Sequence, residues 1–368
     1  MTSSKPLTVG VSLPLTGRFE KSAGVYYDRA YRLWEKQINL DGGLLGRPVE
    51  LVVYDDESEA AKTGENYARL IDGDHVDLLL GPCHSFLVEA AAPIVEAAGK
   101  LLIQGSGSSH ELFRKGSRSL FLCWSGCDFD YPKSFLEFAT SDASPRKVES
   151  IALVYTDWRI GNAVAEGVRH HASAMGIPIT FEEGIGDPPV DYAGMMQRAF
   201  ATKPDALLIG LDHVRTDKPM DEAVTAALAA GFERSQIWLS DNPSPKDRRM
   251  GDAMDGIYMR GSWVPEDQSP LSVAFRDAFK DEYGYVPEYH SAGGYACCQV
   301  LSQVVASTGG TDAAVMRQAL LRDSFDTVMG ELRFAESGLP DATIQLCQWQ
   351  GESLEVVYPK NARTKPAR

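Results

Sequence analysis

The sequence predicts an α/β protein built from two doubly wound parallel sheets, and three observations lead to this prediction. Short apolar runs alternate with amphipathic segments along most of the chain, which is the pattern of right-handed βαβ units. The alternation stops at "CWSGCDFDYPKS" and then restarts. The length of 368 residues also exceeds the roughly 250 to 300 residues at which a single core stops growing.

The first series of alternating segments begins with "LTVGVSLPLTG", which is broken by Pro14 and Gly17 as expected of a buried strand that runs into a loop. A helix follows, because Ala30, Leu33 and Trp34 recur at spacings of three and four. Further strands are predicted at "VELVVYDDE", "VDLLLG" and "KLLIQG", with helices at "AAKTGENYARLID" and "FLVEAAAPIVEAAG" between them. These segments predict a parallel sheet that helices cover on both faces.

The second series has the same rhythm. Strands are predicted at "VESIALVYTD", "IPITFEEG", "DALLIGL", "SQIWLSD" and "GIYMRGSW", and helices at "AEGVRHHASAMG", "YAGMMQRAFATK" and "EAVTAALAAG". After "WVPEDQ" the chain becomes helical again and closes with a strand-rich tail from "GELRFA" to "LEVVYP". The sequence therefore predicts a second α/β lobe of similar size.

Charge and hydropathy narrow the class of partner. The net charge of -15 argues against nucleic acid and against an anionic membrane surface, since both are bound through Lys and Arg. No apolar run reaches the roughly 18 residues of a membrane span. The start "MTSSKPLTVGVSLPLTG" lacks the basic and apolar regions of a signal peptide, so no export signal is expected. A small-molecule partner is the better expectation.

No motif predicts catalysis, a metal or a cofactor. "GSGSSH" departs from the dinucleotide fingerprint because His110 takes the last glycine position. His170 and His171 are adjacent on a predicted helix, so they point about 100 degrees apart and do not chelate one ion. The six cysteines include the neighbours Cys297 and Cys298 and are expected to be buried free thiols. The protein is therefore not expected to be an enzyme.

Small hydroxyl residues follow two neighbouring strands of the first lobe. Ser85 precedes one predicted helix, and Ser108 and Ser109 precede a shorter helical segment. In open parallel sheets, ligands bind at the carboxyl ends of strands, where helix N-termini favour negative charge. These serines predict a site for an anionic group such as a carboxylate. The alternative is that each serine only caps its helix.

Several segments in a fixed order carry a family resemblance. "LTVGVSLPLTG", "INLDGGLLGRPVELVVYDDE", "LLLGPCHS", "LLIQGSGSSHELF" and "IALVYTDWRIGNAVAEGV" together resemble the leucine/isoleucine/valine-binding branch of the periplasmic binding proteins, over about Leu7 to Tyr358. The resemblance implies a type I periplasmic binding fold, with two lobes joined by three crossings and a hinge that closes around the ligand. It implies a first lobe of residues 1–122 with 264–330 and a second lobe of residues 123–263 with 331–368.

The resemblance also implies ligand-binding residues. Ser85 matches the serine that binds the ligand carboxylate, and Gly107, Ser108 and Ser109 match the donors of the next loop. In the second lobe Ile160 stands where the family has a tyrosine, so Trp158 is expected to cover the ligand instead. Asp241 matches the acid that binds an α-ammonium group, with Asp212 as a second candidate. For Asp241 the alternative is a turn residue, and for Trp158 it is ordinary packing.

Two functions follow from this resemblance. The first is a transport receptor that captures an amino acid or related carboxylate in the periplasm and delivers it to ABC permease subunits. The alternative is a cytoplasmic ligand-sensing regulator similar to the amide sensor of the same fold family, which the missing signal peptide and the six cysteines favour. Serines in one lobe and an acid in the other suit a zwitterion, because a bound amino acid neutralises both.

Overall fold

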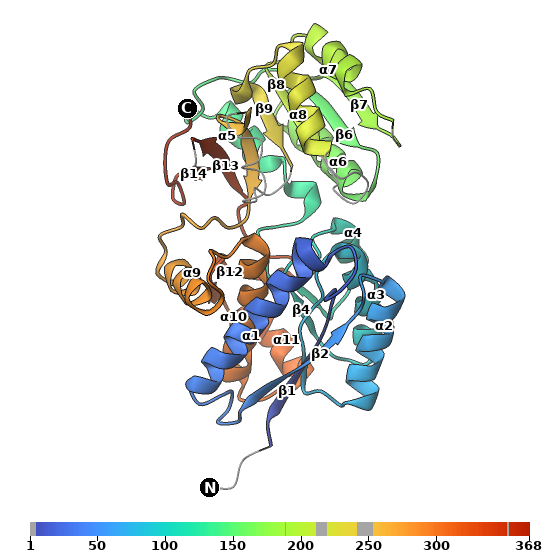
Figure 1. Cartoon of the computed structure of the whole chain (residues 1–368), viewed down its shortest axis with the longest axis vertical. Helices are drawn as coiled ribbons and strands as arrows, with labels where there is room; N and C mark the ends of the chain where they lie inside the picture. The colour runs from blue at the N-terminus through green and yellow to red at the C-terminus, as the bar shows by residue number, and fades with distance from the viewer. Residues whose placement is uncertain (1–4, 188, 211–218, 241–252, 352) are drawn as a thin grey trace. The chain divides into compact units, whose positions relative to one another are not determined.

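The computed structural model describes residues 5–187, 189–210, 219–240, 253–351 and 353–368. The chain forms two compact units (Figure 1). Unit 1 contains Met1–Gly126 and Asp267–Ala342, and unit 2 contains Cys127–Glu266 and Thr343–Arg368. The chain therefore passes between the units three times.

The last passage between the units lies later in the chain than the sequence analysis places it. Residues 331–342, assigned there to the second lobe, belong to unit 1. The reason is local pairing, because β12 (Gly330–Leu332) pairs with β11 (Phe325–Thr327). The ring of Phe334 then packs against Phe121 of the same unit, with ring centroids 5.4 Å apart.

Unit 1 is built on parallel strands in a doubly wound order. Strands β2 (Val49–Asp55), β1 (Leu7–Leu13) and β3 (Leu78–Leu79) lie side by side in that order. A parallel bridge from Leu80 to Ile103 continues the series to β4 (Leu102–Gln104), which pairs with β5 (Leu120–Leu122). The alternating apolar residues of β1 are fully buried, as the sequence predicts.

Helices enclose this sheet. Helix α1 packs along α10, and α2 packs along α3. In α1 the residues that are buried recur at helical spacing, and they include Ala30, Leu33 and Trp34. The helices of unit 1 are α1 (Val25–Leu40), α2 (Ala60–Ala68), α3 (Ser85–Ala97), α4 (His110–Arg114), α9 (Pro270–Tyr283), α10 (Tyr289–Thr308) and α11 (Ala313–Arg322).

Unit 2 has a seven-stranded sheet in the order β14-β13-β10-β9-β8-β6-β7. Five neighbouring strands are parallel, namely β7, β6, β8, β9 and β10. At the β10 edge, β13 and β14 are added as antiparallel strands. The strands are β6 (Ile151–Thr156), β7 (Ile179–Ile185), β8 (Ala206–Gly210), β9 (Ile237–Leu239), β10 (Tyr258–Gly261), β13 (Gln345–Gln350) and β14 (Ser353–Tyr358).

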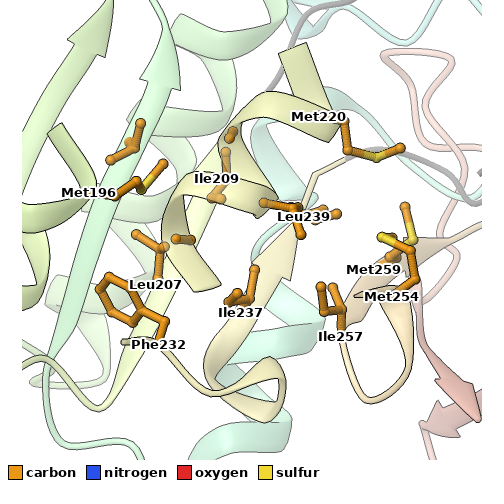
Figure 2. Packing of buried hydrophobic residues seen from close by; sticks show 14 of the residues in the cluster. Met196, Leu207, Ile209, Met220, Phe232, Ile237, Leu239, Met254, Ile257 and Met259 are labelled. Carbon is orange, nitrogen blue, oxygen red and sulfur yellow. The ribbon is translucent and has the colours of Figure 1, made fainter. Parts of the chain in front are cut away.

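Both faces of this sheet are covered, which confirms the doubly wound α/β prediction. Figure 2 shows side chains of one apolar cluster, in which Leu207, Ile209 and Leu239 pack with Met196 and Phe232. Alternate residues of the same strands face a second cluster on the opposite side. The covering helices are α5 (Lys133–Thr140), α6 (Arg159–Ala174), α7 (Tyr192–Ala201) and α8 (Pro219–Ala230). Helix α5 begins at the end of the break "CWSGCDFDYPKS" and continues through a stretch to which the sequence analysis assigns no element.

Two further features bear on the class of protein. All six cysteines are buried, as predicted, and they are free thiols. Among the described residues, none of the helices combines the length and the apolar character that a membrane span requires.

Candidate functional site

The carboxyl ends of the strands in unit 1 form the edge at which a ligand site is expected. In the order β2-β1-β3, strand β2 lies on one side of β1 and strand β3 lies on the other. Ligands of open α/β sheets bind at such a switch point, where the order of the strands reverses. Three loops leave the sheet there, at residues 14–19, 80–84 and 105–109. The serines predicted from the sequence lie in the last two of these loops or directly after them.

Ser85 and Ser109 are brought together by the fold. The Ser85 Oγ accepts a hydrogen bond of 3.2 Å from the backbone N–H of Ser109. Ser85 is the first residue of α3, and the cap position before it is occupied by His84. Ser109 precedes α4, where its side chain makes no capping bond. Neither hydroxyl therefore acts as a helix cap, which was the alternative explanation for these serines.

Gly107 is held inside its loop rather than presented to a ligand. Its N–H donates to the Oε1 of Gln104 at 2.5 Å, and the Gln104 Nε2 donates to its carbonyl at 3.1 Å. A Cβ at this position would lie 2.6 Å from the Cγ2 of Val88. The Ser108 N–H likewise donates to the carbonyl of Ser106 at 2.8 Å. A ligand here would meet side-chain hydroxyls and the first N–H groups of α3, which have no intrahelical acceptor.

His84 is a residue of this edge that sequence reasoning missed. Its backbone has φ 68 and ψ 137, a strained conformation for a side chain of this kind, and such strain is concentrated at functional sites. Its buried Nε2 has no hydrogen-bond partner among the described residues. Burial lowers the pKa of His84 to about 3, with smaller contributions from His290 and Arg18. The imidazole is therefore neutral at physiological pH, and no spacing in the sequence signals it.

Aromatic rings surround this histidine. The ring of His84 lies 4.1 Å from the Phe19 ring and 6.5 Å from the His290 ring, measured between centroids. Trp124 packs near His290 at 6.3 Å, and its buried Nε1 has no acceptor among the described residues. The Nδ1 of His290 lies 3.1 Å from the buried carboxylate of Glu288. The edge thus combines apolar rings with a few polar atoms, which is typical of small-molecule sites.

A hydrogen-bonded chain holds Phe19 in this position. The Phe19 N–H donates to the Ser58 Oγ at 3.1 Å, and the Ser58 N–H donates to the Asp56 Oδ1 at 3.0 Å. Asp56 also accepts a bond of 3.2 Å from the Ser12 hydroxyl. Asp56 and Ser58, which follow β2, therefore anchor the loop after β1.

The predicted residues of unit 2 are only partly described. Trp158 is half-buried and directly precedes α6, at the carboxyl end of β6. Asp212 and Asp241 lie outside the described residues. Arg260, which sequence reasoning missed, lies at the same edge of the sheet as Trp158. A charged residue at a buried position of the apolar strand "GIYMRGSW" was the signal that could have found it.

The side chains at these strand edges are suited to binding a small ligand. Burial raises the pKa of the Cys83 thiol well above its ordinary value, so the thiol beside Ser85 is not a reactive thiolate. Within the described ranges, no group of three or more His, Cys, Asp or Glu side chains is arranged to hold a metal ion. Serine hydroxyls and a helix N-terminus suit the binding of a small carboxylate.

Known proteins share this architecture. A profile of the periplasmic binding proteins matches residues 6–353. The leucine-, isoleucine-, valine-, threonine- and alanine-binding protein of Pseudomonas aeruginosa is 23% identical over 321 residues, which cover 86% of this chain and 83% of that protein. A solved ABC transporter substrate-binding protein from Desulfitobacterium hafniense in complex with Leu matches with a TM-score of 0.79 and 22% identity, covering 96% of this chain and 100% of the other.

A further solved structure has a different ligand. The ABC transporter solute-binding protein from R. palustris in complex with benzoate has a TM-score of 0.77 and 20% identity, and the match covers 99% of this chain and 98% of the other. These structures confirm the predicted type I periplasmic binding fold. Because the profile matches nearly the whole chain, this protein belongs to the periplasmic binding protein family, whose members are non-enzymatic substrate-binding proteins of transporters.

Proposed function

We propose that this chain is the substrate-binding protein of an ABC transporter and that it captures an amino acid or a related small carboxylate. Relatives with amino-acid-binding names and a relative solved with leucine support this proposal. The relative solved with benzoate shares with them a ligand that carries a carboxylate. The observation on which the proposal depends is the pairing of Ser85 with Ser109 at the N-terminus of α3.

Each residue of the unit 1 edge has a role in this proposal. The hydroxyls of Ser85, Ser108 and Ser109 and the first N–H groups of α3 bind the ligand carboxylate, since an anion at a helix N-terminus is stabilised by the helix dipole. Gly107 allows its loop to approach Val88 closely. The neutral ring of His84 and the Phe19 ring border the apolar part of the ligand.

Unit 2 supplies the rest of the site in this proposal. Trp158 covers the ligand, and an acid after a strand binds its ammonium group, with Asp241 first and Asp212 as the second candidate. The units close on the ligand about the chain segments that join them, as hinge-closing binding proteins do. A zwitterion satisfies the opposite charges of the two edges, whereas an amine or an acid alone satisfies one.

The proposed partners follow from the same family. ABC permease subunits receive the ligand, and the protein acts in the periplasm. A binding protein of this kind needs no cofactor and no metal ion. The alternative, a cytoplasmic ligand-sensing regulator, predicts that the protein stays with the cytoplasmic fraction, so cell fractionation of the native host separates the two locations.

Substitution of Ser85 tests this function. A thermal-shift screen of the common amino acids and benzoate is expected to yield at least one stabilising ligand, because binding to the native state raises its melting temperature. For that ligand, Ser85→Ala is expected to weaken binding measured by calorimetry by about tenfold to a hundredfold, the range for hydrogen bonds to charged groups.

Ser117→Ala is the matched control. The Ser117 hydroxyl accepts a bond of 3.3 Å from the Ser119 N–H before β5 begins, at the opposite end of the strand from the site. Its removal is expected to leave affinity unchanged. A Ser85→Ala protein with a lower melting temperature and wild-type affinity would limit Ser85 to a structural role, and a screen without any stabilising ligand would contradict the proposed function.

A further inference from the structure

Arg18 is an exposed cation in the loop that follows β1, beside the N-terminus of α3. Its guanidinium carbon lies 4.5 Å from the centroid of the Phe19 ring and 5.3 Å from the centroid of the Phe86 ring, within the range of cation–π contacts. Phe86 directly follows Ser85 in α3. The charge of Arg18 also contributes to the lowered pKa of His84, the residue before Ser85. The positive charge of Arg18 therefore lies close to both chain neighbours of Ser85.

Hydrogen bonds fix the loop that carries Arg18. The Asp55 carboxylate accepts bonds of 3.2 Å from the Thr16 N–H and 2.7 Å from the Thr16 hydroxyl. The Ser58 hydroxyl donates to the Thr16 carbonyl oxygen at 2.8 Å. Gly17 has a φ of +84, and a Cβ there would lie 2.4 Å from a backbone carbonyl oxygen of the turn after β2. The loop therefore packs closely on that turn and holds the backbone of Arg18 in place.

The guanidinium of Arg18 has no counter-ion among the described residues. Arg32 of the same unit pairs with Asp28 at 2.9 Å, whereas in the described ranges Arg18 forms neither an ion pair nor a hydrogen bond. Contact with two aromatic rings orients the guanidinium and leaves its N–H groups available, since these lie at the edges of the group. Arg18 is therefore an oriented donor for an anion beside the N-terminus of α3.

We propose that Arg18 pairs with the carboxylate of the ligand and makes the site selective for a carboxylate over the neutral amide of the same shape. This inference rests on the proposed function, in which the Ser85 hydroxyl and the first N–H groups of α3 bind that carboxylate. An amide oxygen can accept bonds from those neutral donors as well. A guanidinium favours the anion, because it adds a full charge and parallel N–H donors that match two carboxylate oxygens. Every residue in this inference belongs to unit 1.

Calorimetry with matched pairs of a carboxylate and its amide tests this inference. The pairs are L-leucine with L-leucinamide and benzoate with benzamide, together with any other amino acid that the thermal-shift screen identifies and its amide. The wild-type protein is expected to bind the carboxylate of a pair about tenfold or more tightly than the amide. Arg18→Met is expected to weaken carboxylate binding by about tenfold, between the effect of an exposed ion pair and that of a buried charge-assisted bond, and to leave amide binding unchanged.

Arg118→Met is the matched control. Arg118 is an exposed arginine of the same unit that precedes β5, at the opposite end of the strand from the site. Its substitution removes the same charge and should change neither affinity. The salt dependence of binding is a second readout, because ions screen an exposed charge pair. Raising the salt concentration from about 50 mM to about 500 mM should weaken carboxylate binding in the wild type and in Arg118→Met more than in Arg18→Met.

Arg18→Lys is the second variant if Arg18→Met does not fold. Lysine keeps the charge but loses the bidentate geometry, so the preference for the carboxylate should fall by less than in Arg18→Met. If the wild type does not prefer the carboxylate, or if the folded variants keep the full wild-type preference, the inference is wrong and the proposed function stands. An equal loss of carboxylate and amide binding would limit Arg18 to shaping its loop and would also overturn the inference.

The absence of binding by every carboxylate tested has a different meaning. It would contradict the proposed function itself, and the role of Arg18 with it. The two failures are therefore distinguishable in one set of measurements.

Discussion

Asp56 and His84 are two residues of unit 1 whose ionisation the fold changes in opposite senses. Burial raises the pKa of Asp56 to about 6, so folding favours its protonated form, and this contribution to stability is lost as the pH rises through about 6. Burial lowers the pKa of His84 to about 3, so folding favours the neutral ring, and stability falls as the pH drops below about 6.5. The two effects oppose each other in the wild-type pH profile.

Asp56→Asn separates these effects. The amide stays neutral and can still accept the bond from the Ser58 N–H, so the variant should gain stability relative to the wild type as the pH rises from 5 to 8. A shift of about two pKa units corresponds to roughly 3 kcal/mol in all, and roughly half of it falls between pH 5 and 8, because the rest is lost below pH 5. Melting temperatures measured at each pH check the prediction, with Asp72→Asn at an exposed position as the control for one lost surface charge. A constant difference between Asp56→Asn and the wild type would contradict it.

At the scale of elements, the approach of α10 to the sheet positions Trp124. A Cβ on Gly293 would lie 2.3 Å from the Trp124 Cζ3 and 2.8 Å from the Gly105 carbonyl oxygen. The glycine therefore lets the helix contact both the Trp124 ring and the loop that follows β4. Glu288 is the N-cap residue of this helix, and its side chain accepts a bond from the His290 N–H. His290 therefore lies at the N-terminal end of α10, as Gly293 does.

Gly293→Ala is expected to destabilise the protein despite the better helix propensity of alanine. The gain in propensity is about 1 kcal/mol, whereas overpacking against a ring and a backbone carbonyl costs about 1 to 3 kcal/mol and should weaken ligand binding as well. Urea denaturation measures the change in the free energy of unfolding. The control is Gly64→Ala in α2, where the nearest atom is the flexible Ile94 Cδ1 at 3.2 Å. Equal effects of the two substitutions would show that the contact with Trp124 has no special cost.

At the scale of the whole molecule, each unit has its own apolar core and its own buried thiols. Cys83, Cys123, Cys297 and Cys298 lie in unit 1, and Cys127 and Cys347 lie in unit 2. Burial raises the pKa of the Cys83, Cys127 and Cys347 thiols. The thiols therefore report on the opening of each core.

A thiol-specific reagent such as Ellman's reagent is expected to react with none of the six cysteines in the native protein and with all six in denaturant. Protection follows from burial and from the low thiolate fraction. Mass spectrometry after brief labelling at intermediate denaturant concentrations identifies which unit opens first. Rapid labelling of any cysteine in the native protein would contradict the burial of that residue.

The sequence by itself determined most of the regular elements and their order, although α5 and β5 were not predicted. Strand and helix periodicities are local, because each element buries one face or one stripe of its own side chains, so the alternation predicted both doubly wound sheets. The rule that ligands bind at strand ends also located Ser85, Ser108 and Ser109 in unit 1. The spacing of residues contains this information directly.

The tertiary structure alone decided how the edges are built. The strained backbone of His84, the chain from Asp56 through Ser58 to Phe19, and the stacking of Arg260 on Tyr131 all join residues that are distant in sequence or adopt conformations that no periodicity encodes. The pairing of β12 with β11 likewise moved residues 331–342 into unit 1. The physical reason is that burial and non-local packing set these conformations and the pKa values of Asp56 and His84. Burial and non-local packing arise only when separate segments of the chain come together.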